Sequence, residues 1–356
     1  MRTAHLPVFI VPVLFLVGCN PVPTGGTYIY AAGGRDNGSG VVEAGYWKDG
    51  SWTSLPALDA SKPSYIQSIF VSGTDVYAAG VNTNGSDVWV AGYWKNGQWI
   101  GLGQLDSSKP CMVNGVFVSG TDVYVGGASE NSSGVFEAGF WKNGAWNALP
   151  ALASGHNAMA YSLFVAGADV YAAGICNDGN GVFVPGYWKN SQWTGLSQLD
   201  TSKDSFVYSI VVSRSDVLVG GVSCDNSDIV VPGYWKNSTW NELTPPDSAL
   251  CAGVYSLFVD GTDAYAAGFS RKDYSTAIVP GYWKNGTWIG LPPLDPSKDA
   301  KVQSVVVSGT DVYAGGCCVN SSDVAVAGCW KNGVWQGLPC PPVGQGSIVY
   351  SVAVGP

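Results

Sequence analysis

Gly-Tyr-Trp-Lys-Asp-Gly at residues 45–50 is the first of seven closely related sequence motifs, and their repetition is the main indication of the fold of this chain. The phrases recur every 47 residues, with one interval of 48, and place their tryptophans at Trp47, Trp94, Trp141, Trp188, Trp235, Trp283 and Trp330. A second tryptophan follows each of these five residues later, so only Trp89 of the 15 tryptophans lies off the grid. Periods of about 40 to 50 residues are typical of β-propellers and related arrays. The repeat therefore predicts seven equivalent structural units.

Each unit contains four short apolar runs separated by turn residues. In the second repeat the first three runs cover 66–71, 76–79 and 88–94, and a fourth begins at Gln98. Asn96-Gly97 lies between the last two runs and favours a type I′ hairpin, because both central residues of that turn need positive φ. β-Branched and aromatic residues dominate the runs, as in strands, and no helical periodicity is evident after the leader. The sequence predicts four antiparallel strands per unit.

The two ends of the chain complement one another. The first repeat has its second strand at 28–32 but no room for a first strand, whereas residues 348–354 match the first strand of the second repeat. Pairing the termini would remove an exposed sheet edge. We therefore expect an all-β fold: a seven-bladed β-propeller with four antiparallel strands per blade, closed by the C-terminal strand, which completes blade one.

The first 26 residues have the pattern of an export signal. Arg2 precedes an apolar stretch at 6–17 that is too short to span a bilayer. Leu16-Val17-Gly18-Cys19 resembles the lipobox of bacterial lipoproteins, which implies acylation of Cys19; the alternative is an ordinary signal peptide with an incidental cysteine. We expect a signal peptide at 1–18, a lipidated Cys19 and tether at 19–26, and the propeller at 27–356. The resemblance implies a lipid-anchored protein of the bacterial cell envelope, at the outer membrane or cell surface in a Gram-negative cell.

Charge and cysteine content narrow the possible partners. The formal net charge is −9 and the sequence has no basic patch, which disfavours nucleic acid and anionic lipid headgroups. Membrane contact is therefore expected from the lipid alone, and the ring is expected to be a monomer. Eight cysteines follow Cys19, and exported proteins can form disulfides. Cys176 and Cys224 lie at the start of equivalent loops in neighbouring repeats, and we expect a disulfide between them.

The sequence shows no catalytic or metal-binding constellation. His156 is the one histidine outside the leader, which gives no His-rich metal site and no visible triad. Glu43 and Glu137 occupy equivalent positions, but nothing distinguishes one carboxylate pair for glycoside hydrolysis. We expect no catalytic residue, no metal, no cofactor and no enzymatic activity.

Several repeated residues allow both a structural and a binding interpretation. The motif Leu-Asp-x-Ser-Lys contains Asp59, Asp106, Asp200 and Asp295, and either forms a turn between blades or contacts sugars or cations. The tryptophan grid indicates packing between blades, with sugar stacking by the second column as the alternative. Trp89 shares its position with Phe136 and Phe183 and is expected in the core.

Variable loops are the expected place for ligand binding. The turns between strands one and two and between strands three and four are short and uniform, whereas the segments at the other end of each unit vary. Binding residues concentrate on variable loops held by a rigid scaffold. The candidate ligand-binding residues are Arg35, Asp36, Asn82, Asp87, Glu130, Asn177, Asp178, Asp225, Arg271, Lys272, Asp273 and Tyr274.

The repeated phrases also carry a resemblance. Ser-Ile-Phe-Val-Ser-Gly-Thr-Asp from Ser68, Val-Tyr-Ala-Ala-Gly from Val76 and Gly-Tyr-Trp-Lys-Asn-Gly from Gly92 resemble repeats of uncharacterised bacterial propeller lipoproteins. The Gly-Gly pairs, such as Gly33-Gly34, are loosely similar to kelch repeats. Two hypotheses follow: a lipid-anchored, non-catalytic interaction scaffold that binds a protein or another envelope component through its variable loops, or a surface lectin or polysaccharide-binding module. The ligand, protein or glycan, is not identified by the sequence.

Overall fold

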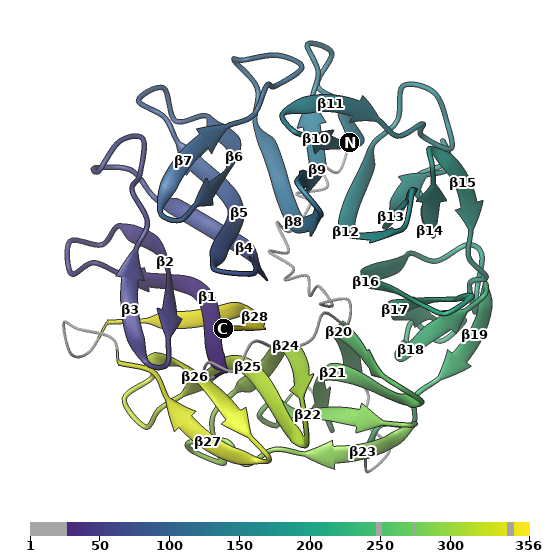
Figure 1. Ribbon diagram of the computed structural model, residues 1–356. Helices are drawn as coiled ribbons and strands as arrows, with labels where there is room; N and C mark the ends of the chain where they lie inside the picture. Colours follow the sequence, from purple (N-terminus) through teal and green to yellow (C-terminus); the bar gives the residue numbers. More distant parts are fainter. Residues whose placement is uncertain (1–26, 247–250, 274, 340–344) are drawn as a thin grey trace.

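The protein folds entirely into strands within the part of the chain that the structure describes. This computed structural model describes residues 27–246, 251–273, 275–339 and 345–356, so the predicted leader, Cys19 and Tyr274 lie outside it. The described residues form 28 strands and no α-helix. They lie in six sheets, five with four strands and one with eight, arranged around a common centre (Figure 1). The predictions of an all-β, propeller-like fold and of four-stranded antiparallel units are confirmed.

The strands fall into four sets according to their distance from the centre (Figure 1). The innermost set comprises β28 (Ser347–Gly355), β4 (Ser64–Ser72), β8 (Cys111–Ser119), β12 (Ala158–Ala166), β16 (Ser205–Ser213), β20 (Cys251–Asp260) and β24 (Ala300–Ser308). The second set comprises β1 (Tyr28–Asp36), β5 (Asp75–Thr83), β9 (Asp122–Glu130), β13 (Asp169–Asn177), β17 (Asp216–Cys224), β21 (Asp263–Arg271) and β25 (Asp311–Val319).

The two outer sets follow in the same order. The third comprises β2 (Val42–Lys48), β6 (Trp89–Lys95), β10 (Phe136–Lys142), β14 (Phe183–Lys189), β18 (Val230–Lys236), β22 (Val279–Lys284) and β26 (Ala325–Lys331). The outermost comprises β3 (Ser51–Ser54), β7 (Gln98–Gly101), β11 (Ala145–Ala148), β15 (Gln192–Gly195), β19 (Thr239–Glu242), β23 (Thr287–Gly290) and β27 (Val334–Gly337).

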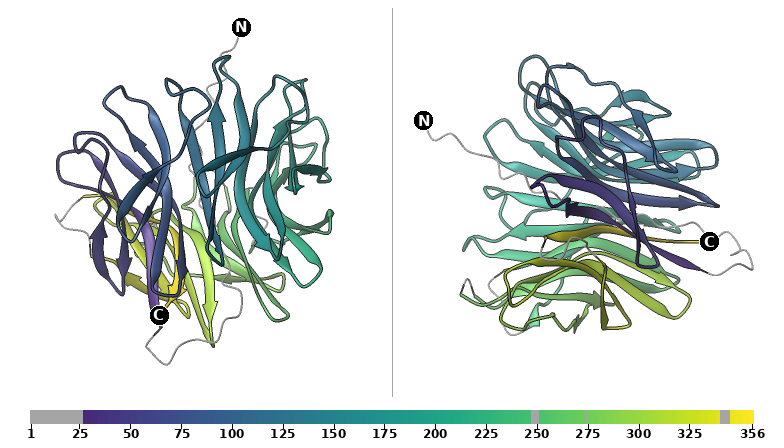
Figure 2. Two further views of the ribbon diagram at one scale, coloured as in Figure 1. Left: turned by 45° about the horizontal axis from the view of Figure 1, so that its top comes forward. Right: turned by 90° about the vertical axis from the view of Figure 1, so that its left-hand side faces the viewer.

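Pairing within the sheets is antiparallel, and the chain ends meet in one sheet. The last strand, β28, pairs with β1 in the order β28-β1-β2-β3, with Ala31 opposite Val352. The eight-stranded sheet consists of two four-stranded halves joined by one parallel residue pair, Val230 and Cys251. Figure 2 shows these sheets from two further sides, with neighbouring sheets packed face to face.

The innermost strands are linked to one another by serine hydroxyls. The backbone N–H of Val116 on β8 donates to Ser68 Oγ on β4 at 3.2 Å. Equivalent bonds lead to Ser162, Ser209, Ser256, Ser304 and Ser351, the last from Ile69 N on β4 at 3.3 Å. Gly115 interrupts the serine series, and there the Asn114 Nδ2 donates to Ala160 O at 2.9 Å instead. A buried N–H requires a partner, so these bonds fix the spacing of the inner strands.

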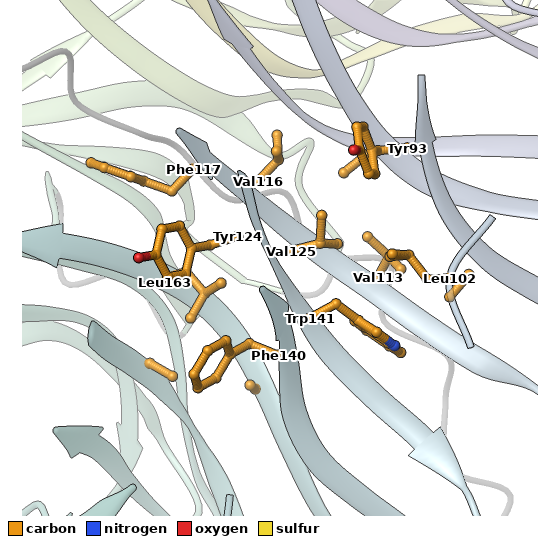
Figure 3. Packing of buried hydrophobic residues seen from close by; sticks show 14 of the residues in the cluster. Tyr93, Leu102, Val113, Val116, Phe117, Tyr124, Val125, Phe140, Trp141 and Leu163 are labelled. Carbon is orange, nitrogen blue, oxygen red and sulfur yellow. The ribbon is translucent and has the colours of Figure 1, made fainter. Parts of the chain in front are cut away.

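The tryptophan grid packs neighbouring sheets together. Trp94 is fully buried, and its indole Nε1 donates to Pro56 O of the preceding repeat at 2.9 Å. Trp99 covers Gly92, where an added Cβ would lie 2.3 Å from the Trp99 ring, so a side chain there would displace it. Figure 3 shows the equivalent Trp141 among Leu102, Val113 and Phe140 in a buried cluster. Packing between units, which was the structural interpretation of the grid, accounts for the first tryptophan column, whereas the second column packs against glycines of its own sheet.

One end of the sheets, the hairpin face, carries the uniform turns after the first and third strands of each unit. In the second repeat Asn96 has φ 50°, its Oδ1 accepts from Val76 N at 2.8 Å, and its Nδ2 donates to Asp75 Oδ1. Asp75 Oδ2 in turn lies 3.0 Å from Lys95 Nζ. The repeated aspartate thus joins two hairpins of one sheet, as expected for a structural role.

Candidate functional site

The other end of the sheets, the variable face, carries the loops between second and third strands and the connectors between units. In the described residues its loops cover 37–41, 84–88, 131–135, 178–182, 225–229 and 320–324. Connectors such as 55–63 and 102–110 border these loops. Antiparallel pairing brings both kinds of segment to the same end of each sheet. The eleven candidate ligand residues that the structure describes belong to this face or to strand ends beside it, whereas Tyr274 lies outside the described residues.

Several of the candidate acidic and amide residues hold their own loops together. Asp36 Oδ1 accepts from Gly38 N at 2.7 Å, and Asp225 Oδ1 accepts from Ser227 N and Ile229 N. Asn177, Asp178 and Asp273 make the same kind of bond. The backbone amide of Asn180 lowers the pKa of Asp178, and the Ser275 hydroxyl lowers that of Asp273. These oxygens stabilise Asx turns and are only partly available to a ligand.

Ion pairs join several connectors between units to the variable loop that follows each of them in the chain. Lys62 Nζ lies 2.6 Å from Asp87 Oδ1, and the Asp87 side chain remains 73% exposed. Lys203 and Lys298 pair with the equivalent Asp228 and Asp323, whereas Lys109 pairs with Glu130 at 3.4 Å. Exposed pairs of this kind contribute little to stability, about 0–1 kcal/mol. They nevertheless present fixed charged groups at the surface.

The Leu-Asp-x-Ser-Lys motif forms a turn and presents an apolar side chain. Asp59 Oδ1 accepts from Ser61 N and from Ser61 Oγ, which is the turn interpretation of the motif. The leucine before it, Leu58, is 49% exposed. The equivalent leucines are also exposed: Leu105, Leu152, Leu199 and Leu294. The connectors therefore place a row of apolar side chains on the variable face.

The arginine-containing loops differ from the rest. Arg35 Nε lies 2.9 Å from Glu43 Oε2, and its guanidinium lies 4.6 Å from the centroid of the Trp52 ring. Arg271 Nε donates to Thr276 O at 2.9 Å, and Lys272 is exposed. Both arginines are thus bound within their own repeats.

The second repeat gathers features that the other described repeats do not combine. Trp89 and Tyr65 are both half-buried, and their ring centroids are 6.0 Å apart. Lys62 precedes Tyr65 by three residues, Asp87 precedes Trp89 by two, and Lys62 and Asp87 form an ion pair. Thr83 is directly opposite Trp89 in the β5–β6 register. We call Lys62, Tyr65, Thr83, Asp87 and Trp89 the second-repeat cluster.

Two polar side chains at this place lack partners among the residues that the structure describes. Thr83 is 5% exposed, and its Oγ1 has no hydrogen bond within the described residues. Asn82 is fully buried on the other side of the strand, and neither its Oδ1 nor its Nδ2 is bonded there. In the third and fifth repeats serines replace Asn82; Ser129 and Ser223 accept from connector N–H groups. Buried polar groups without partners are uncommon and indicate a place for water or ligand.

The remaining chemistry-bearing residues do not assemble into a centre. In the described chain no three His, Cys, Asp or Glu side chains lie close enough to hold a metal ion. The seven cysteines that the structure describes are free thiols, including Cys176 and Cys224, so the expected disulfide between these two is wrong in this structure. Burial raises the pKa of Cys111 to about 11. A cavity of about 230 Å³ lies at the hairpin face near Asp49 and Tyr313, away from the variable loops.

The structure adds residues that sequence reasoning missed. Trp89 was expected in the core but is half-buried beside Tyr65, which was not singled out. Its position off the tryptophan grid was the available signal. Lys62 was considered only as part of a repeated motif, and Thr83 was not considered. Tyr274 lies outside the described residues, so its placement stays a prediction.

Comparisons with known proteins give a structural likeness and no family. No family model matches the chain, and no curated protein matches it. A solved structure titled "Structure of a new family of Polysaccharide lyase PL25-Ulvanlyase" is similar over 86% of this chain and 84% of its own, with 10% identity and a TM-score of 0.49. This match corrects the expectation that the chain is not an enzyme, because the similar structure is that of a lyase. That expectation is therefore dropped, and no catalytic residue is transferred.

Within the described ranges, no helix combines the length and apolar character needed to cross a membrane.

Proposed function

We propose that the protein binds polysaccharide through its variable face, with the second-repeat cluster as the principal site. The contact that carries this proposal is the pair of half-buried rings, Trp89 and Tyr65, beside the exposed Lys62–Asp87 ion pair. Aromatic faces provide apolar area for the C–H faces of sugar rings. Charged and hydroxyl groups fixed beside the rings can bind the sugar hydroxyls. Ligand sites commonly combine an apolar wall with a few polar groups in this way.

The rigidity of the surroundings supports the same function. Trp89 begins β6 and Tyr65 lies on β4, so both rings project from paired strands rather than from a loop tip. Gln104 Nε2 of the neighbouring connector donates to Trp89 O at 3.3 Å. A site whose backbone is fixed loses less conformational entropy on binding.

The experiment uses three variants of the chain from Asn20 and any polysaccharide that the parent retains in affinity electrophoresis. Trp89→Ala should weaken retention about tenfold or more, since it removes a large apolar contact. Phe136→Ala changes the equivalent half-buried aromatic of the third repeat and should retain binding. Lys95→Ala changes the hairpin face and should also retain it. Equal loss in all three variants, or no loss with Trp89→Ala, would contradict this location.

A protein ligand is the second candidate function, because of the exposed leucines on five connectors. Polysaccharide binding should survive Leu105→Ser and Leu199→Ser, whereas a protein interface on this row should not. Cross-linking of parent and double variant in the cell envelope distinguishes the two.

We also propose that the sheets form a closed seven-bladed propeller, with each half of the eight-stranded sheet as one blade. The pairing of β28 with β1 and the serine bond from β4 to β28 support closure. For the N-terminus we propose lipid attachment at Cys19 and location in the cell envelope, with the ring as a monomer. Mass spectrometry of the mature N-terminus tests the lipid: an unmodified mature chain beginning elsewhere would overturn it.

A further inference from the structure

Every innermost strand carries a β-bulge at an equivalent place. In β4 the register passes from Ile66 to Ser68, which leaves Gln67 unpaired in the ladder. The other inner strands skip one residue in the same way. Three skipped residues are amides: Gln67, Asn114 and Gln303. Four are tyrosines: Tyr161, Tyr208, Tyr255 and Tyr350. A bulge redirects its side chain, and here all seven side chains are uncharged.

Three of the bulge tyrosines contact one another from one inner strand to the next. The rings of Tyr161 and Tyr208 are 6.1 Å apart, and those of Tyr208 and Tyr255 are 5.6 Å apart. Asn114 Nδ2 reaches Ala160 O on the next inner strand. Because the inner strands lie nearest the common centre (Figure 1), the seven bulge positions on them form a belt around that centre, the axial belt.

The belt contains buried acceptors without partners. Gln67 and Gln303 are 6% and 7% exposed, and within the described residues neither Oε1 has a hydrogen bond. Their strands, β4 and β24, lie on either side of β28, which carries Tyr350 between them. Burial raises the pKa of Tyr350 to about 12, so its hydroxyl remains a donor at neutral pH. Asn114 differs, because its amide replaces the missing serine bond at Gly115.

The charge and hydrogen-bonding capacity of the axial-belt residues restrict the class of ligand that could bind there. Two buried carbonyl oxygens require donors, and leaving them unpaired costs stability unless water or a ligand donates. The absence of charge among the bulge residues disfavours an ionic group there. A tyrosine ring between two amides offers an apolar face together with polar groups on both sides.

We propose that Gln67, Tyr350 and Gln303 form an axial subsite for one neutral sugar residue, whose hydroxyl groups donate to the two glutamine oxygens. The choice of a sugar rests on the proposed polysaccharide-binding function, whereas the place rests on the bulges and the unpaired acceptors. The second-repeat cluster would then hold the polymer at the surface, and the axial subsite would hold a single residue, such as a chain end.

The test uses Gln67→Leu/Gln303→Leu in the chain from Asn20, with Asn114→Leu as the matched control. The probes are neutral trisaccharides of glucose and of N-acetylglucosamine. In the parent, the side-chain amide signals of Gln67 and Gln303 in ¹⁵N NMR should shift on adding at least one trisaccharide. The double variant should bind that trisaccharide roughly tenfold more weakly or worse.

Thermal melts separate a binding role from a structural one. The double variant should melt no lower than the parent, because it removes buried acceptors that have no partner in the described part of the chain. Asn114→Leu should melt lower, because it breaks the bond to Ala160 O. A fall in melting temperature like that of the control would show that the glutamines are structural and overturn the proposal.

The outcomes also separate this proposal from the proposed function. If the parent retains polysaccharide but neither glutamine amide responds to any trisaccharide, the axial subsite is wrong and surface binding stands. If the amides respond to a trisaccharide but no polysaccharide is retained, the axial subsite stands and surface binding is wrong. Unchanged trisaccharide affinity in the double variant also overturns the axial subsite, since water alone would then satisfy the two oxygens.

Discussion

The indole Nε1 of Trp47 donates to the carbonyl oxygen of Pro339, 292 residues further along the chain, at 2.8 Å. Trp94 makes the same bond to Pro56, only 38 residues before it, and Trp188 makes it to Pro150. The first and last repeats therefore meet through the contact that joins consecutive repeats. This equivalence is what a closed ring requires of its two ends.

Trp47→Phe should destabilise the protein as much as Trp188→Phe does. Each change removes the indole donor of this hydrogen bond and leaves a cavity in place of the larger, fully buried ring, with a cost of about 2 to 4 kcal/mol. Denaturant unfolding followed by circular dichroism measures both. A cost for Trp47→Phe below a quarter of that for Trp188→Phe would show that the end contact is dispensable.

Removal of residues 347–356 should abolish cooperative unfolding. This deletion eliminates β28, which pairs with β1 and receives the Ile69 N–H on Ser351. It exposes a full strand edge and unpairs the inner side of the first sheet. Thermal melts of the truncated and full chains from Asn20 provide the comparison, and an unchanged sharp transition would contradict the role of the terminal strand.

Ser256→Ala should cost about 1–3 kcal/mol, because the buried N–H of Val305 loses its acceptor at 3.2 Å. Ser107→Ala, at an exposed connector position, is the control and should have an effect near zero. Chemical denaturation of both variants checks the difference. Equal stability of the two would mean that the serine bonds do not hold the inner strands together.

Much of this fold could be predicted from residue spacing, because each repeat shows its turns directly. Asn96-Gly97 and the Trp94 and Trp99 positions require a hairpin and packing between sheets wherever they recur. The strand bulges could not be found in this way, since Gln67 breaks an apolar alternation without any turn residue. The serines were visible in the repeated phrase, but their bonds join different repeats and depend on how the sheets pack.

The candidate site was harder to predict. Loop polarity identified Asp36 and Asp225, yet their carboxylates bind their own loops, a local contact that polarity alone does not reveal. Trp89 resembled its counterparts Phe136 and Phe183 in the sequence. The contact between the Trp89 and Tyr65 rings, and the unbonded Thr83 opposite Trp89, depend on how β4, β5 and β6 come together.

Stability should decrease as the pH falls below about 4. Lys142 and Asn143 hold the pKa of Asp122 below its usual range, and hydrogen bonds lower the pKa of the hairpin-face aspartates of the other repeats in the same way. A lowered folded-state pKa gives stability that is present above the unfolded pKa and is lost as the pH falls through the folded one. Melting temperatures between pH 7 and about pH 2 measure this, and Asp122→Asn should flatten the acid slope. A slope unchanged by that substitution would assign acid sensitivity to other groups.

Binding of the chain from Asn20 to a broad panel of neutral and acidic polysaccharides tests the proposed function most directly. The account predicts saturable binding to at least one polysaccharide, weakened by Trp89→Ala and unaffected by Phe136→Ala. The same incubations, followed for the release of shorter oligosaccharides, show whether the polymer is also cleaved. Folded protein that binds no member of the panel would contradict the account and favour a protein ligand on the variable face.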